Sequence, residues 1–188
     1  QTYLRGTCGW GSLGVNKNLS GGTLSIDGNK YSKGFAVHAN SILLFDLPEG
    51  AVRFKAHAGI DNTGSDQGSK SSVEFLVFNE DPTLRTETTD QWSGGNVTIK
   101  IDPGKQVACS GYIGKKGKQL ANIEADITGA EKLYLVVTNG GDGLSYDHAD
   151  WANPVLVDKD GNEVSLTTLN WDANPVNGWN APKKNTNN

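Results

Sequence analysis

The sequence predicts an all-β domain, and three observations lead to this fold class. Short apolar runs are separated by many Gly, Asn, Asp, Ser and Thr residues, and Gly alone contributes 24 of 188 positions. Few segments have helical periodicity, whereas several alternate between apolar and polar residues as half-buried strands do. The length suits one domain with a real core and is too short for two ordinary ones.

The first predicted elements are an aromatic anchor and a hairpin. Trp10 stands between Gly9 and Gly11, which indicates a close approach of the backbone to another element, and we interpret the indole as a core or edge aromatic. Residues 24–31 predict a β-hairpin, because Asp27-Gly28 supplies the positive φ of a tight turn. Residues 33–47 predict one strand or two collinear strands.

The middle of the chain alternates clearly in three places. Residues 51–60, 73–78 and 119–127 place apolar side chains on one face and therefore predict half-buried strands. The segment 79–118 is less regular, with short strands expected at 97–101 and 106–113. Trp92, beside two glycines in a polar stretch, is expected to be exposed, as sugar-stacking or protein-contact residues are.

A polar loop between two strand-like runs, 133–137 and 154–157, is the most informative stretch. It holds Asp142, Asp147, His148, Asp150 and Trp151. Loops on a rigid sheet commonly carry function. If the neighbouring strands are antiparallel, their ends bring His38, Asp61, Asp147, His148, Asp150 and Trp151 into one cluster.

Such a cluster has three interpretations. Half-buried carboxylates must be paired, hydrogen-bonded or bound to a cation, and calcium prefers oxygen-rich loops. An imidazole with carboxylates and an indole also suits sugar hydroxyls, which both donate and accept hydrogen bonds. The alternative is a hydrogen-bonded network that fixes the loops and binds nothing.

Other function classes are disfavoured. The net charge of -4 argues against nucleic acid or an anionic membrane as partner, and no apolar run could span a bilayer. Neither a Gly-x-Ser-x-Gly elbow nor a His-Glu-x-x-His motif occurs, so catalysis has little support. Cys8 and Cys109 form either one disulfide or two free thiols.

Four blocks of the sequence, taken in order, resemble one known family. Residues 31–41, 58–61, 141–143 and 147–152 are similar to the NPCBM-type domain, also called the family 51 carbohydrate-binding module. The resemblance implies a jelly-roll β-sandwich with a structural calcium, appended to a secreted microbial glycoside hydrolase and therefore extracellular. It also implies a monomer without catalytic activity that binds galactose-containing glycans, including blood-group A and B antigens.

These inferences define the expected site and domain organisation. The expected sugar contacts are His38, Asp61, Asn62, Gln67, Trp92, His148 and Trp151, and the expected calcium ligands are Asp142, Asp147 and Asp150. The alternative function is a protein-docking module without a sugar site. Residues 1–158 are expected to form the binding module. Residues 159–188 are expected to form an extension in which residues 164–171 pack on the domain as an edge strand and the residues beyond 182 are disordered. The alternative is that the extension begins a further module.

Overall fold

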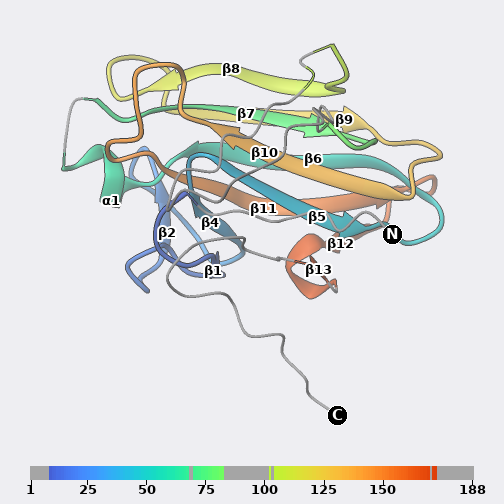
Figure 1. Ribbon diagram of the computed structural model, residues 1–188. Coiled ribbons are helices and arrows are strands. Elements are labelled where there is room, and N and C mark those ends of the chain that lie inside the picture. Colours follow the sequence, from blue (N-terminus) through green and yellow to red (C-terminus); the bar gives the residue numbers. More distant parts are fainter. Residues whose placement is uncertain (1–8, 68–69, 83–101, 103, 170, 173–188) are drawn as a thin grey trace.

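The computed structural model shows a sandwich of two antiparallel β-sheets (Figure 1). The structure describes residues 9–67, 70–82, 102, 104–169 and 171–172. Almost every element in these ranges is a strand, with one short helix, α1 (Asn62–Ser65), and one 3-10 turn, η1 (Leu166–Thr168). The predicted all-β sandwich is therefore confirmed.

The two sheets are named here after their central strands. The β11 sheet contains, in spatial order, β1 (Gly14–Val15), β4 (Gly34–His38), β11 (His148–Asp158), β6 (Ala51–Ile60) and β9 (Leu120–Asp126), and β12 (Glu163–Ser165) also pairs with β11. The β10 sheet contains β13 (Trp171–Asp172), β5 (Ser41–Asp46), β10 (Lys132–Thr138), β7 (Ser72–Phe78) and β8 (Ala108–Gly114).

The core lies between these sheets and is made from the alternate residues of each strand. On β6, Phe54, Ala56, Ala58 and Ile60 are buried as the alternation predicts. The next residues along this strand point outward, so the outer face of the β11 sheet carries polar side chains. This outer face is where the candidate site lies.

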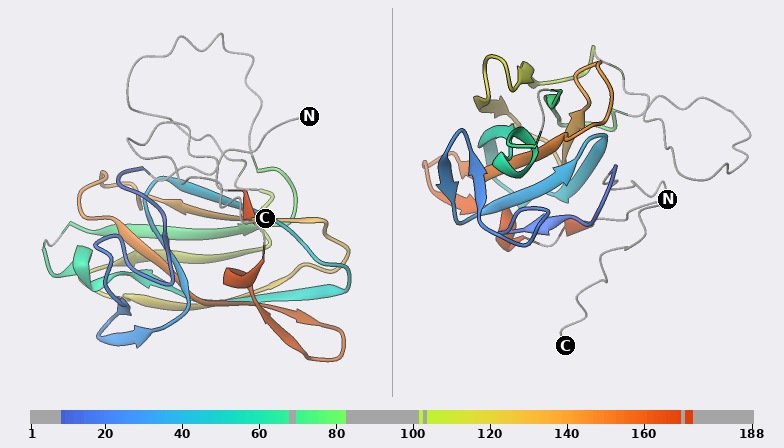
Figure 2. Two further views of the ribbon diagram at one scale, coloured as in Figure 1. Left: turned by 90° about the horizontal axis from the view of Figure 1, so that it is seen from below. Right: turned by 90° about the vertical axis from the view of Figure 1, so that its left-hand side faces the viewer.

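The predicted hairpin is confirmed as β2 (Leu24–Ile26) and β3 (Asn29–Tyr31). Asp27 and Gly28 both have positive φ, at 49° and 77°. The hairpin packs on the outer face of the β11 sheet, where a Cβ added at Gly59 would lie 2.4 Å from Ile26 Cγ2. Glycine at position 59 is therefore required for this packing. The hairpin and α1 lie at the same end of the sandwich (Figure 2).

Two predictions of strand placement were wrong. Residues 33–47 do not form collinear strands, because β4 belongs to the β11 sheet and β5 to the β10 sheet. The polar loop is also shorter than expected. The strand β11 already begins at His148, so Asp150 and Trp151 lie within a strand, where neighbouring side chains point to opposite faces.

The C-terminal extension packs on the sandwich as far as it is described. The strand β12 pairs with β11, and β13 pairs with β5. Cys109 is a free, exposed thiol, whereas Cys8, the strand expected at 97–101 and the end beyond residue 172 lie outside the described residues. Within the described ranges, no helix has the length and apolarity to cross a membrane.

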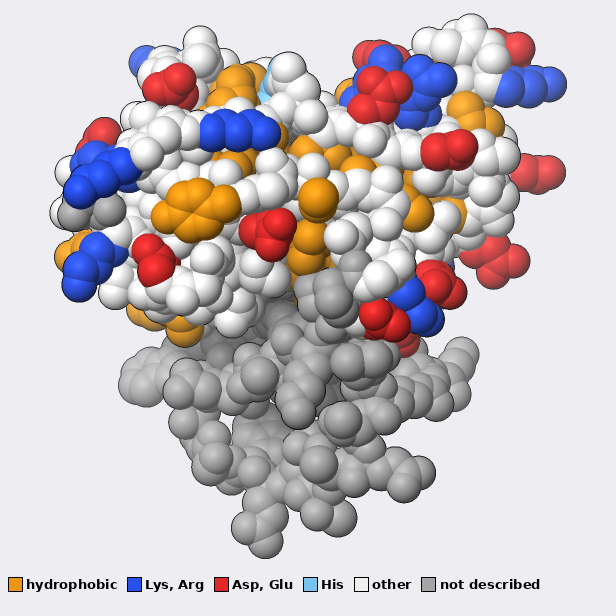
Figure 3. All heavy atoms as spheres, turned by 90° about the horizontal axis from the view of Figure 1, so that it is seen from above, with side chains coloured by type: hydrophobic (Ala, Val, Ile, Leu, Met, Phe, Trp, Pro, Cys, Tyr) orange, Lys and Arg blue, Asp and Glu red, His pale blue; other side chains and the backbone are white. Residues whose placement is uncertain are grey.

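The charged surface is mixed in sign. On the face seen in Figure 3, described Lys and Arg side chains are interspersed with Asp and Glu. Four ion pairs among the described residues are all partly exposed, for example Arg53 with Glu124 at 3.0 Å. Such pairs contribute little stability.

Candidate functional site

Two histidines face each other across neighbouring strands at one end of the β11 sheet. His148, the first residue of β11, pairs directly with His38, the last residue of β4. The two imidazole centroids are 5.5 Å apart in an edge-on arrangement. Both side chains are buried, with 6% of His38 and 8% of His148 exposed to solvent.

Trp10 lies over this histidine pair. Its ring stacks on His148 with a centroid distance of 6.2 Å and an interplanar angle of 12°, and it meets His38 edge-on at 6.0 Å. The side chain is nevertheless 64% exposed. An exposed indole beside two polar rings offers both an apolar surface and hydrogen-bonding groups.

Gly9 explains how Trp10 reaches this position. Its amide donates to the His38 carbonyl at 3.0 Å, and a Cβ at Gly9 would lie 2.1 Å from the Ala39 carbonyl oxygen. Only glycine allows this contact. The predicted close approach of the backbone at Trp10 is thus confirmed, but the indole is a surface side chain and not a core aromatic.

A chain of hydrogen bonds fixes the protonation of His148. The Thr63 hydroxyl donates to Asp61 Oδ1 and lies 2.9 Å from His148 Nδ1, so it accepts from an Nδ1–H of the imidazole. In a neutral ring the lone pair is then on Nε2. His38 has the same tautomer, because its Nδ1 lies 2.7 Å from the Ala39 carbonyl, which can only accept.

Both imidazoles are neutral near pH 7. Burial lowers the pKa of His38, and burial followed by the nearby His38 lowers the pKa of His148, with Asp61 opposing the shift. A neutral His148 of this tautomer offers its Nε2 as an acceptor beside the indole. This atom suits a hydroxyl donor.

Asp61 and Asn62, predicted as sugar contacts, hold the hairpin in place. Asp61 Oδ2 accepts from the Ser25 amide at 3.0 Å. Asn62 Oδ1 accepts from the Ser25 hydroxyl at 2.7 Å and from the Gly28 amide at 3.1 Å. Asp61 also caps α1 by accepting from the Thr63 amide at 2.8 Å. These hydrogen bonds fix the hairpin and α1 next to the two histidines.

Asp150 lies next to Asp61. It shares the outer face of β11 with His148, is fully buried, and neither carboxylate oxygen has a hydrogen-bond partner by distance among the described residues. Burial and then the neighbouring Asp61 raise the pKa of Asp150 well above its usual value. Both causes favour the protonated form of Asp150, because they disfavour a second charge beside Asp61.

The three predicted calcium ligands do not meet. Asp142 and Asp147 both contact Ser72, whose hydroxyl donates to Asp142 and whose amide donates to Asp147 Oδ1 at 2.9 Å, whereas Asp150 lies with Asp61. Within the described part of the chain, no group of three or more His, Cys, Asp or Glu side chains is arranged for a metal ion. The trio does not fit one site, and calcium binding stays a prediction.

Asp147 is a second buried acid without full pairing. Its Oδ2 has no hydrogen-bond partner among the described residues. Burial raises its pKa to about 7, the Ser72 amide opposes this shift, and Asp142 adds to it. A carboxyl with this pKa is only partly ionised at neutral pH.

The remaining predicted contacts lie elsewhere. Trp151 is fully buried in the core, with its ring 4.8 Å from Phe75 and 6.0 Å from Phe54, so its indole has no surface for a sugar. Gln67 is exposed after α1 and donates to the Thr63 carbonyl. Trp92 lies outside the described residues.

Sequence reasoning therefore missed two members of the site, Trp10 and Thr63. The glycines beside Trp10 were a usable signal, since they indicated a close contact that brings the indole onto another element. Nothing local distinguishes Thr63 from the other hydroxyl residues of its polar loop.

Comparisons with known proteins identify the class. The NPCBM/NEW2 domain family matches residues 1–157. A CBM51 module from Clostridium perfringens GH95 in complex with methyl-galactose superposes with a TM-score of 0.60 at 22% identity, covering 84% of this chain and 95% of that one. CBM51-2 of Clostridium perfringens ZmpB gives a TM-score of 0.63 at 22% identity, covering 87% of this chain and 30% of that one.

A curated relative is an alpha-1,3-galactosidase B from Akkermansia muciniphila. It is 31% identical over 145 residues, which are 76% of this chain and 15% of that protein. The chain thus spans a small part of that galactosidase. The fold and the family match define a non-catalytic carbohydrate-binding module of the kind attached to glycoside hydrolases. The chain belongs to the NPCBM/NEW2 domain family.

Proposed function

We propose that the module binds galactose-containing glycans at the cluster of Trp10, His38 and His148. The observation that carries the proposal is the pairing of an exposed indole with two neutral imidazoles at the strand ends. The apolar face of galactose would stack on Trp10, while one of its hydroxyls donates to Nε2 of His148. A shallow site of this size gives weak binding, with a dissociation constant of about 1 μM to 1 mM.

The comparisons support the sugar class. One neighbouring module was solved with methyl-galactose, and the sequence relative is named for galactosidase activity. A further structure of the ZmpB module contains GlcNAc, so the hexosamine is the competing ligand. In the proposed role, an attached, extracellular glycoside hydrolase is targeted to host or mucin glycans of the blood-group A and B type.

Calorimetric titration tests this proposal. Methyl-galactoside and the blood-group A and B trisaccharides should give saturable heats, and glucose should not. Parallel titrations with GlcNAc decide between the two sugar classes. Repeating the series in EDTA tests the predicted calcium, because loss of binding would place a cation in or behind the site. No heat with any galactoside would refute the galactose assignment.

The second candidate is protein docking, favoured by a different surface. Tyr112 on β8 is 60% exposed, and Val107 just before this strand is also exposed. The two lie at the edge of the β10 sheet, within the less regular segment 79–118. Under this alternative, sugar titrations are silent and Tyr112→Ala weakens the association with neighbouring domains of the parent enzyme.

A further inference from the structure

A second cluster with an aromatic ring and polar groups lies on the outer face of the β11 sheet. Tyr31, the last residue of the hairpin, packs on His57 of β6 with ring centroids 5.5 Å apart. His57 Nδ1 lies 2.7 Å from Oδ1 of Asn122, its direct neighbour on β9. None of these three residues is fully buried.

The hydrogen bond between His57 and Asn122 determines what the cluster offers a ligand. Since Asn122 Oδ1 can only accept, His57 donates from Nδ1 and a neutral ring carries its lone pair on Nε2. The Asn122 amide group keeps both N–H donors. No other hydrogen bond to the side chains of His57, Asn122 or Tyr31 is present among the described residues.

This combination matches the chemistry of a sugar ring. One acceptor and an adjacent pair of donors can engage two neighbouring hydroxyls, each of which donates and accepts. Tyr31 supplies an aromatic surface beside them. A ligand with hydroxyls and a C–H face therefore fits better than a purely apolar or purely ionic one.

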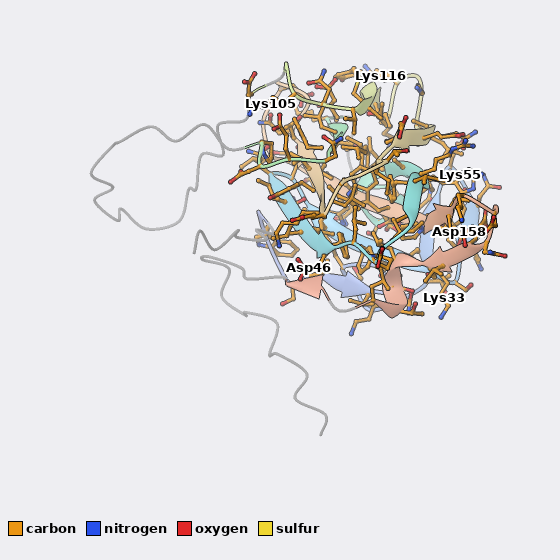
Figure 4. All side chains as sticks on the ribbon, turned by 90° about the vertical axis from the view of Figure 1, so that its right-hand side faces the viewer. Lys33, Asp46, Lys55, Lys105, Lys116 and Asp158 are labelled. Atoms are coloured by element: carbon orange, nitrogen blue, oxygen red, sulfur yellow. The ribbon has the colours of Figure 1, made fainter. Side chains whose placement is uncertain are left out.

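The two basic side chains that precede His57 on β6 are paired with acids, which reduces their attraction for an anion. Arg53 pairs with Glu124 at 3.0 Å and Lys55 with Glu163 at 3.8 Å. Figure 4 shows Lys55 on the same side of the molecule as Lys33 and Asp158 and far from Lys105.

The cluster is separate from the Trp10 site. On β11, His148 and Ala152 point to the same outer face, and His57 pairs with Ala152. His148 and Ala152 are four residues apart on this strand, which separates the two clusters by about 13 Å. The hairpin contacts both regions, since Ile26 is bridged to Asp61 and Tyr31 packs on His57.

We propose that Tyr31, His57 and Asn122 form a second, weaker glycan-binding site that takes one pyranose ring through a pair of vicinal hydroxyls. The inference rests on the proposed function only for the ligand class, since its residues are independent of the Trp10 cluster. Two weak sites on one face let a branched or repeated glycan gain affinity by avidity.

Proton–nitrogen NMR titration of the full chain tests the proposal. Methyl-galactoside and methyl-N-acetylglucosaminide are added separately, up to about 20 mM, which exceeds a dissociation constant of about 1 mM. Two sets of signals should saturate independently, one around Trp10 and His148 and one around Tyr31, His57 and Asn122. Trp10→Ala should remove the first set only, and His57→Ala the second only.

Asn122→Asp is the sharpest variant. It keeps the acceptor that orients His57 but replaces the N–H donors, so the affinity of the second set should fall about ten-fold. Lys132→Ala, on the other sheet, is the control and should change neither set. Absence of saturating shifts at Tyr31 and His57, or shifts that Asn122→Asp leaves unaltered, would overturn the second site. If only the signals around Trp10 failed to shift, the proposed function would be overturned instead.

Discussion

Trp10 and Trp151 show how differently the same side chain is used in two regions of this module. Trp10 is 64% exposed and stacks on His148, whereas Trp151 is fully buried between Phe54 and Phe75. Trp151 is only three residues from His148, and Trp10 is far from it in sequence. The alternation of side chains between the two faces of a strand, together with long-range contacts, therefore determines which indole reaches the site, and proximity in sequence does not.

The largest expected effect comes from removing the buried indole. Trp151→Ala leaves a cavity between the sheets and should lower the free energy of unfolding by about 3–5 kcal/mol. Urea denaturation followed by circular dichroism measures this, with Trp151→Phe as the milder control. A loss below about 1 kcal/mol would contradict the core role. Sugar affinity of the folded fraction should change little, since the indole does not face the site.

The support below the histidines comes next. Asp61→Ala removes the acceptor for the Ser25 amide and for both donors of Thr63, which should cost about 2–3 kcal/mol of stability. His148 should also lose its orientation, so sugar binding weakens. Asp61→Asn keeps one acceptor oxygen and should have a smaller effect in both urea denaturation and calorimetry.

The exposed indole should show the opposite behaviour. Trp10→Ala should weaken galactoside binding at least about ten-fold, or 1.4 kcal/mol, by removing the stacking surface. Its melting temperature should remain close to that of the parent because little buried area is lost. Tyr112→Ala removes another exposed aromatic and is the matched control in calorimetry. Equal loss of binding in both variants would refute the site at Trp10.

Much of the fold could be predicted because its signals are local. Alternation identified β6, and Asp27-Gly28 identified the hairpin turn, since both depend on neighbouring residues. The prediction that His38, Asp61 and His148 meet also agrees with the structure. The burial of Trp151 could have been predicted too, because residues 148 and 151 of one strand face opposite sides.

The rest of the site depends on contacts that local patterns do not encode. Trp10 reaches the histidines only through the contact of Gly9 with Ala39, thirty residues further along the chain. The acidic residues appeared to be one group because they are close in sequence. In the structure, Asp147 accepts a hydrogen bond from the Ser72 amide, whereas Asp150 lies next to Asp61. The register of β11 places the two acids apart.

The smallest effect concerns pH and tests this separation of the acids. The pKa of Asp147 is raised to about 7, above its unfolded value near 4. Below pH 4 the carboxyl is protonated in both states, and stability is then lost as the pH rises from about 4 to 7.

Asp147→Asn keeps an acceptor for the Ser72 amide and removes this loss. The variant should match the parent at pH 4 and exceed it by about 1–2 kcal/mol at pH 8, allowing for solvent screening. Urea denaturation at both pH values measures the difference. Parallel pH profiles would show that Asp147 is ionised at no cost, as expected if a cation or an additional hydrogen-bond donor accompanied it.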